Sequence, residues 1–312
     1  MKKSILLGIA ASFFFAFTFV LNRQMNLSGG SWIWSASLRY IFMLPILFAI
    51  VGAKNELSYV LKDIREKPME WILWSTVGFG LFYAPLCFAS AYGASWMVAS
   101  TWQITIVAGA LLSPLFYESA ETENGIIKNR NKIPKKSLKM SLIILAGIFL
   151  IQLQQAVDVS FLKTLMGVIP VIIAAFAYPL GNRKMMEVCD GKFNTFQRVF
   201  GMTLCSIPFW IVLSTFGILK VGLPGKEQIV QALMVSIFSG IVATILFFKA
   251  TDMVRSDSHK LAVVETTQAG EVIFALLGEI FILNSDFPTV LGLIGIMLVV
   301  IGMILNSLTS SE

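Results

Sequence analysis

The sequence predicts an all-α polytopic membrane protein with ten transmembrane helices, arranged as two inverted five-helix repeats with both termini in the cytoplasm. Of its 312 residues, 56% are hydrophobic and only 13% are charged, whereas a soluble domain of this size carries about 25% charged residues. The apolar residues gather in ten long runs, and the basic residues gather in alternate loops between these runs. This composition excludes a water-soluble fold and a disordered chain.

The apolar runs have about the length that crosses the hydrocarbon core of a membrane, which takes roughly 20 residues in a helix. The first run follows two lysines but is long and lacks a small-residue cleavage site, so we expect an uncleaved helix rather than a signal peptide. The ten runs are 5–21, 32–51, 71–92, 94–116, 139–154, 163–180, 195–217, 229–250, 260–283 and 287–306.

Basic residues are distributed unequally between the two sides of the predicted bundle. Of the 24 Lys and Arg residues, 17 fall on the side of the termini, four on the other side and three within runs. Because cytoplasmic loops carry an excess of Lys and Arg, we expect both termini and the basic loop 118–138 in the cytoplasm. We interpret this loop as a topology signal rather than a nucleic-acid-binding patch, so no nucleic-acid partner is expected.

The second half of the chain repeats the pattern of the first. Residues 98–116 and 263–281 share eight identities at matching positions, and these include the pair Gln103 and Gln268. Because each half has five helices, an odd number, the second half enters the membrane the opposite way round. Further matched pairs are Gly8 with Gly167, Arg39 with Arg198, Gly80 with Gly240, Phe88 with Phe248 and Gly147 with Gly295.

We therefore divide the chain into a first repeat, 1–154, which includes the basic loop, and a second repeat, 155–312. Together they form one membrane domain. Inverted repeats are the architecture of many secondary transporters, which bind substrate between the two repeats. The alternative is a duplicated bundle with a structural or signalling role.

Several segments resemble the drug/metabolite transporter superfamily. Residues 11–19, 31–35 and 101–105 are similar to its ten-helix branch of multidrug resistance efflux transporters. The resemblance implies a bacterial inner-membrane exporter whose central cavity is bordered by helices of both halves, with the fifth and tenth helices peripheral. One feature departs from the superfamily: its four-helix multidrug members use a glutamate in the first helix, and the first run here has no carboxylate.

No group of residues has the spacing of a catalytic or cofactor site. The single histidine, His259, and three scattered cysteines form no metal-binding pattern and no nucleophile–base pair. Gly225-Lys226 lacks the rest of a phosphate-binding loop. We therefore expect no enzyme activity, no cofactor and no ATP hydrolysis, and we expect any pumping to be coupled to an ion or substrate gradient.

Ionisable residues within the apolar runs are costly in lipid, so each is a candidate functional residue. Arg39 lies roughly 10 Å below the outer face. It either forms a structural ion pair with Glu279, at similar depth, or faces the substrate as a cation. Glu265 either faces the cavity or pairs with Arg198. Arg198 and Lys249 are expected to reach water on the cytoplasmic side.

Glu271 lies roughly 16 Å deep, near the middle of a core about 30 Å thick. Gln268 lies one helical turn before it, and Gln103 and Thr105 lie near the middle of the fourth run. We interpret this polar cluster as a substrate site, and the alternative is polar bonding between helices. The predicted substrate-binding residues are Glu271, Gln268, Gln103, Thr105, Trp102, Tyr83, Tyr178 and Arg39, and the predicted proton-coupling residues are Glu271 and Glu265.

These observations predict a secondary active transporter of the bacterial plasma membrane that exports small organic compounds, drug-like cations or metabolites, by alternating access. Protons are the predicted driving ion, and Glu271 is the predicted coupling carboxylate. One alternative is an amino-acid or anionic-metabolite exchanger with Arg39 at the site. Another is a non-transporting membrane scaffold or sensor. The expected partners are a small-molecule substrate and the lipid bilayer, and the sequence leaves a homodimer open.

Overall fold

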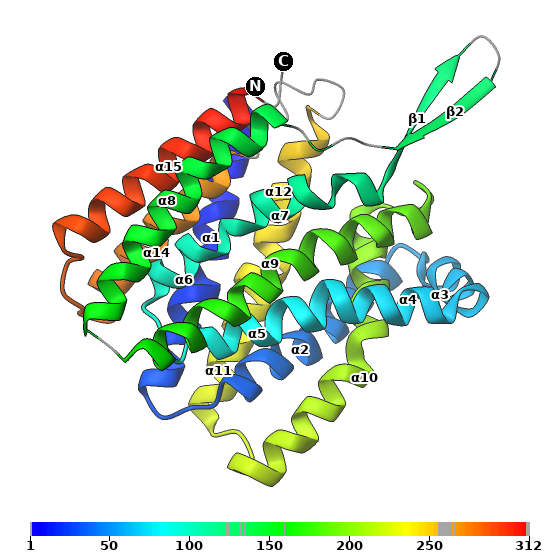
Figure 1. The fold of residues 1–312 in the computed structure, drawn as a ribbon. Helices are drawn as coiled ribbons and strands as arrows, with labels where there is room; N and C mark the ends of the chain where they lie inside the picture. Colours follow the sequence, from blue (N-terminus) through cyan, green and yellow to red (C-terminus); the bar gives the residue numbers. More distant parts are fainter. Residues whose placement is uncertain are drawn as a thin grey trace.

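The computed structural model is a bundle of helices with one short β-hairpin that projects from it (Figure 1). The structure describes residues 2–122, 125–130, 133, 135–158, 160–254, 264 and 266–309. In Figure 1, α1 begins and α15 ends on the side of the bundle that also carries the hairpin and α3.

The first half of the chain combines uninterrupted helices with helices that change geometry part-way. The segments from Pro68 to Ala89 and from Ser95 to Leu115 are each one long helical stretch made of shorter pieces. The elements are α1 (Lys2–Leu27), α2 (Trp32–Gly52), α3 (Leu57–Glu66), α4 (Pro68–Ser75), the π-helix η1 (Thr76–Gly80), α5 (Leu81–Ala89), α6 (Ser95–Trp102), α7 (Ile104–Leu112), the 3-10 turn η2 (Ser113–Leu115), β1 (Tyr117–Thr122), β2 (Gly125–Arg130) and α8 (Lys135–Asp158).

The second half repeats the order of long helical stretches, without a described counterpart of α3 or of the hairpin. A π-helical segment again interrupts the third long stretch of the half. The elements are α9 (Phe161–Cys189), α10 (Thr195–Val221), α11 (Lys226–Val235), the π-helix η3 (Ser236–Ala243), α12 (Thr244–Asp252), the 3-10 turn η4 (Thr266–Ala269), α14 (Gly270–Phe281) and α15 (Val290–Thr309).

Apolar side chains cover the outside of the bundle as well as its core. Seven helical stretches in the described part of the chain are long and apolar enough to cross a membrane, and two further apolar helices, Leu138–Leu153 and Val290–Asn306, are shorter. Leu219 is 77% exposed and Phe281 is 75% exposed, and so extensive an apolar surface is typical of contact with lipid. The chain is therefore a multi-pass membrane protein. The number of ten crossings stays a prediction, because the run 260–283 is described only in part.

The prediction of an all-α fold is wrong in one segment. β1 and β2 form an antiparallel hairpin inside the basic loop 118–138, and its pairing runs from Tyr117 with Arg130 to Thr122 with Gly125. The sequence analysis interpreted this loop only through its charge.

The two halves pack against each other in a reciprocal pattern. α1 packs against η3, α12 and α14 of the second half, and α9 packs against η1, α5, α6 and α7 of the first half. α2 packs along α10, and α8 packs along α15. Figure 1 shows α8 and α15 side by side at one edge of the bundle. The first long helix of each half thus lies among helices of the other half.

Two contacts between the halves bring backbones together at glycines. A Cβ atom built on Gly181 of α9 would overlap the Cα and N atoms of Gly78 in η1. A Cβ atom built on Gly147 of α8 would lie 2.6 Å from the carbonyl oxygen of Gly295 in α15. A side chain at Gly181 or Gly147 could therefore be accommodated only if a whole helix moved.

Replacing Gly181 with Ala should destabilise the protein by about 1–3 kcal/mol, the usual cost of overpacking a close-packed interior. Thermal unfolding of the purified protein in detergent would report this cost as a lower midpoint. Gly225→Ala is the control, because a Cβ atom at Gly225 meets nothing within 4 Å and its φ of −71° suits any residue. Equal midpoints for the two variants would contradict the close approach of α9 and η1.

Candidate substrate-binding cavity

A cavity of about 90 Å³ lies between the two halves of the bundle. Its walls come from α1, α2, η1, α5, α6 and α7 of the first half and from α9, α10, η3, α12, η4 and α14 of the second. Among the described residues that line it, none belongs to α8 or α15. Such a volume holds several water molecules, or part of an organic molecule in their place.

Two helical stretches that line the cavity are interrupted beside it. The path from α6 to α7 breaks at Gln103, and α14 is preceded by the 3-10 turn η4, which contains Gln268. At membrane depth, irregular backbone is tolerated only where it is buried in protein or lines a cavity. Interrupted helices also mark the substrate sites of many transporters. The two breaks lie at positions that the sequence repeat aligns.

The two aligned glutamines nevertheless have different surroundings. Gln268 lines the cavity. Gln103 is 1% exposed, and its side-chain nitrogen donates a hydrogen bond to the carbonyl oxygen of Ala99 at 3.1 Å. It bonds within its own helical stretch and is not among the cavity-lining residues. Thr105, two residues later, does line the cavity, and its hydroxyl donates to the carbonyl oxygen of Ala175 at 3.3 Å.

Arg39 enters the cavity from α2 with only 5% of its surface exposed. Its Nη1 donates a hydrogen bond to Oγ1 of Thr18 at 3.1 Å. Its guanidinium carbon lies 4.1 Å from the ring centre of Tyr83 and 5.7 Å from that of Tyr40. Aromatic faces stabilise a desolvated cation by about 2 kcal/mol. The Nε of Arg39 has no hydrogen-bond partner, and no carboxylate in the described ranges lies within ion-pair distance of the side chain.

The alternative of an ion pair between Arg39 and Glu279 is wrong. Glu279 instead accepts hydrogen bonds from the backbone nitrogen of Ser95, at 2.8 Å, and from the Ser95 hydroxyl. Ser95 is the first residue of α6, so this carboxylate joins α14 to the start of α6. The two residues were matched by depth alone, and depth does not determine which helix a side chain faces.

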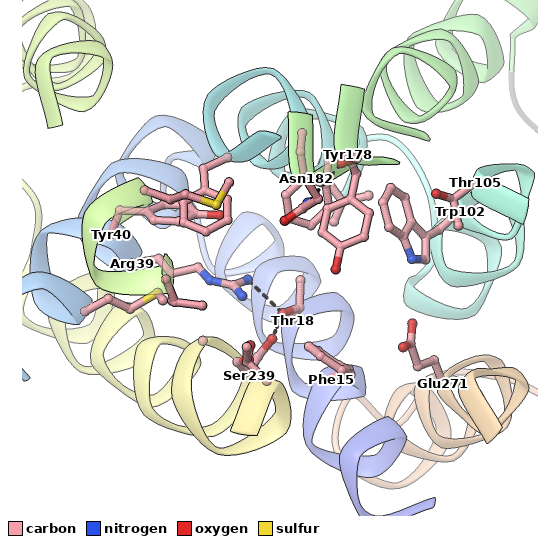
Figure 2. A pocket seen from close by; sticks show the side chains of 18 of the residues that line it. Phe15, Thr18, Arg39, Tyr40, Trp102, Thr105, Tyr178, Asn182, Ser239 and Glu271 are labelled. Carbon is pink, nitrogen blue, oxygen red and sulfur yellow. Dashed lines mark hydrogen bonds between the residues drawn. The ribbon is translucent and has the colours of Figure 1, made fainter. Parts of the chain in front are cut away.

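Glu271 enters the cavity from the side opposite Arg39 (Figure 2). It lies in the first turn of α14, where the helix dipole favours a negative charge. The side chain is 4% exposed, and within the described part of the chain it has no hydrogen-bond or ion-pair partner. Glu271 is thus a buried carboxyl group that faces the cavity.

Aromatic rings form the wall between these two charged residues (Figure 2). The ring centres of Trp102 and Tyr178 are 5.5 Å apart, and Phe82 lies 5.0 Å from the first and 4.8 Å from the second. Tyr83 is completely buried and lies against Arg39 instead of lining the cavity. Six of the eight predicted binding residues therefore line the cavity, namely Arg39, Trp102, Thr105, Tyr178, Gln268 and Glu271.

Glu265 lies outside the residues that the structure describes. Its predicted part in proton coupling and its alternative pairing with Arg198 both stay predictions. Arg198, the repeat mate of Arg39, lines the cavity.

A chain of buried amides that the sequence analysis did not single out connects Tyr83 to one end of the bundle. Asn22 donates to the hydroxyl of Tyr83 at 3.1 Å and accepts from Nε2 of Gln231 at 3.0 Å. Gln228 donates to the hydroxyl of Ser35 at 2.9 Å. These bonds join α1, α2 and α5 of the first half to α11 of the second.

The sequence did contain a signal for this chain of amides. The dipeptide Asn22-Arg23 recurs as Asn182-Arg183 in the aligned stretch of the second half. Asn182 lines the cavity, whereas Asn22 is completely buried in the amide chain. The repeat thus pointed to two asparagines close to the cavity.

Comparison with known proteins assigns the chain to a family. The model of the EmrE family, described as "Putative multidrug resistance efflux transporter", matches residues 2–312. The chain belongs to this family. The resemblance to the drug/metabolite transporter superfamily is thereby confirmed, and the EmrE family is a family of transporters of small compounds.

Relatives and one solved structure extend the comparison. The chain is 56% identical over 308 residues to "Uncharacterized protein YjlA" of Bacillus subtilis (strain 168), covering 99% of this chain and 95% of the relative. It is 51% identical over 269 residues to "Uncharacterized 42.1 kDa protein in intracellular alkaline protease 3'region" of Shouchella clausii. This match covers 86% of this chain and 70% of the relative. One crystal structure matches with a TM-score of 0.64 at 11% sequence identity. The match covers 100% of this chain and 99% of the chain in that structure, which shows a shared fold.

The position of Tyr83 in this EmrE-family chain leads to a graded prediction. Tyr83→Phe removes the hydroxyl that Asn22 donates to and should cost about 1 kcal/mol of stability. Tyr83→Leu also removes the ring face under Arg39 and should cost at least about 1–2 kcal/mol more. Thermal unfolding in detergent would measure both losses. If Tyr83→Leu were as stable as Tyr83→Phe, the contact between the guanidinium and the ring would not stabilise the protein.

Proposed function

We propose that this EmrE-family chain is a secondary active transporter that exports small organic compounds, drug-like cations or metabolites, across the plasma membrane. It works by alternating access, in which two inverted five-helix repeats, 1–154 and 155–312, expose one central site to each side in turn. The observation that carries the proposal is the cavity between the halves, which receives Arg39 from the first half and Glu271 from the second.

The reciprocal packing of the two halves supports an inverted repeat. α1 lies among η3, α12 and α14, and α9 lies correspondingly among η1, α5, α6 and α7. The π-helices η1 and η3 contain the aligned glycines Gly80 and Gly240. Helical interruptions of this kind often lie at functional sites. Two halves of related structure with opposite orientation can rock about a site that both of them border.

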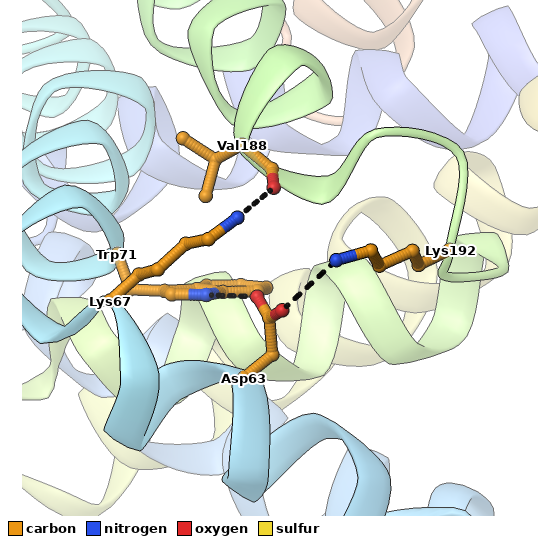
Figure 3. A network of polar contacts seen from close by, with 5 residues as sticks. All are labelled: Asp63, Lys67, Trp71, Val188 and Lys192. Carbon is orange, nitrogen blue, oxygen red and sulfur yellow. Dashed lines mark hydrogen bonds and ion pairs between the residues drawn. The ribbon is translucent and has the colours of Figure 1, made fainter.

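Polar contacts between the halves lie on both sides of the cavity and support alternating access. On one side are the amides of Asn22 and Gln231. On the other side, Asp63 of α3 accepts a hydrogen bond from Nε1 of Trp71 at 3.0 Å and lies 3.9 Å from Nζ of Lys192 (Figure 3). Lys192 follows α9, so this ion pair joins the first half to the second. In an alternating-access cycle each set of contacts breaks when its own side opens.

Proton coupling is assigned to Glu271. A carboxyl group at this depth is stable when it is protonated, hydrated or bound to a cation, so proton release can be exchanged for cation binding. The other titratable or charged groups that line the cavity are Arg39, Arg198, Tyr40 and Tyr178. Among the described residues none of these is a second carboxyl group, so Glu271 is the described acid that can carry this exchange. The inner membrane as location and both termini in the cytoplasm, which the basic loops favour, are part of the same proposal.

Glu271→Gln should leave the protein folded but reduce pH-driven transport at least tenfold, because the amide keeps the shape and removes the titration. The assay uses purified protein in liposomes, a pH gradient, and a panel of labelled organic cations, amino acids and sugar phosphates. Glu279→Gln is the matched control on the same helix, because Glu279 bonds to Ser95 and does not line the cavity. The control should lose stability and keep pH-driven transport.

Parent-like, pH-driven transport by Glu271→Gln would overturn the coupling role. The second candidate, an amino-acid or anionic-metabolite exchanger, would then be favoured, because Arg39 faces the cavity without a carboxylate partner in the described part of the chain. Exchange of labelled amino acids or sugar phosphates without a pH gradient would identify it. A protein that moves no member of the panel in either assay would be a non-transporting scaffold or sensor.

A further inference from the structure

We infer that the cavity binds one zwitterionic molecule whose anionic and cationic groups are separated by an apolar spacer. The anionic group lies at Arg39 and the cationic group at Glu271. The inference rests on the proposed transport function and narrows the substrate to a class. It follows from the positions of Arg39 and Glu271 at two sides of the cavity and from the aromatic rings that line the wall between them.

The first step is that a guanidinium and a carboxyl group are buried in one cavity and do not bond to each other. Arg39 and Glu271 are 5% and 4% exposed, and both line the cavity. They enter it from opposite sides (Figure 2), and they form no ion pair with each other. A buried charge without a partner is costly at membrane depth. Each side of the cavity therefore favours a ligand group of opposite charge.

Arg39 retains free donors for an anion. Nη1 is bound to Thr18, but the buried Nε has no partner. The guanidinium presents its donors in a planar fork, which matches the two oxygens of a carboxylate or a phosphate. The guanidinium carbon also lies 4.1 Å from the ring centre of Tyr83 and 5.7 Å from that of Tyr40.

Glu271 lies where an organic cation can be held from two directions. Its carboxylate points toward the rings of Trp102 and Tyr178 in Figure 2. Aromatic faces attract ammonium groups, and a carboxylate supplies the opposite charge. Arg198 also lines the cavity, but it already takes part in an interaction of its own.

Aromatic rings make up much of the wall between the two groups, and the polar side chains of Thr18, Asn182 and Ser239 also line the cavity. Phe15 and Phe82 line the cavity together with Tyr178. A compound with one charge would leave either Arg39 or Glu271 without a partner. A compound whose two charged groups are bonded to the same carbon atom could not reach opposite sides of the cavity. The fitting ligand therefore has its charges at the two ends of an apolar body.

Three compounds of nearly equal size test the inference on the purified full-length protein. They are 4-(aminomethyl)benzoate, which is zwitterionic, 4-methylbenzoate, which is anionic, and 4-methylbenzylammonium, which is cationic. Ligand-dependent thermal stabilisation in detergent gives the affinity of each. We expect the zwitterion to bind at least tenfold more tightly than either singly charged compound. A zwitterion that binds no better than the better of the two would overturn the inference.

Variants then assign each end of the ligand. Arg39→Gln should remove the preference for the zwitterion over 4-methylbenzylammonium, and Glu271→Gln should remove its preference over 4-methylbenzoate. Glu279→Gln should keep both preferences. If Arg39→Gln does not fold, Arg39→Lys is the substitute, because it keeps the positive charge and removes the planar pair of donors. It should weaken the binding of both compounds that carry a carboxylate. If both cavity variants lost affinity equally for all three compounds, the assignment of the two ends would be contradicted.

The same probes distinguish failure of this inference from failure of the proposed function. If the protein in liposomes carries 4-methylbenzylammonium against a proton gradient and ignores the zwitterion, it is a transporter with a different substrate class. If it binds the zwitterion as expected but moves nothing across the membrane, the site is correct and the transport function is wrong.

Discussion

The burial of one guanidinium, that of Arg39, is the constraint on which much of the helix arrangement depends. An isolated arginine at the centre of a membrane helix costs about 2.5–3.5 kcal/mol on insertion scales. The fold offsets this cost with the Thr18 hydroxyl and the face of Tyr83. Tyr83 is held in turn by Asn22, and Asn22 by Gln231. One charge thus fixes the relative positions of α1, α2, α5 and α11, and so joins the two halves beside the cavity.

Features that depend on the position of a residue along the chain could be predicted from the sequence. The apolar runs predicted most of the membrane helices, and the aligned pair Gln103 and Gln268 marks two helical interruptions at corresponding positions. α8 and α15, which meet at Gly147 and Gly295, lie away from the cavity. Composition, periodicity and repeat alignment are properties of the sequence itself, so these features required no knowledge of how the helices pack.

Features that depend on the direction of a side chain around its helix could not be predicted. Rise per residue gives depth, but successive residues turn by about 100°, so two residues at one depth can face different neighbours. For this reason depth left an ion pair between Glu279 and Arg39 as one alternative, whereas Glu279 bonds to Ser95 in the structure. For the same reason Gln103 bonds to Ala99, while its repeat mate lines the cavity.

The two halves differ in chemistry at positions that the sequence repeat aligns. Arg39 and Arg198 are repeat mates and both line the cavity. Glu271 has no acidic mate, because the aligned position in the first half is Ile106. Among the described residues, the second half therefore adds one carboxylate to a cavity that both halves border. This asymmetry gives the site two ends of different charge, and it is the basis for assigning both proton coupling and ligand orientation to Glu271.

Labelling of one cavity residue from each side of the membrane tests the alternating-access account most directly. Ser239 lines the cavity and is replaced by Cys in a variant that lacks Cys87, Cys189 and Cys205. Ser37→Cys is the control, because Ser37 and Ser239 are both completely buried in the structure but Ser37 does not line the cavity. The account predicts that a membrane-impermeant thiol reagent labels Cys at position 239 from either side, in oriented vesicles, and leaves the control unlabelled. Labelling from one side only, whatever the pH gradient or ligand present, would contradict it.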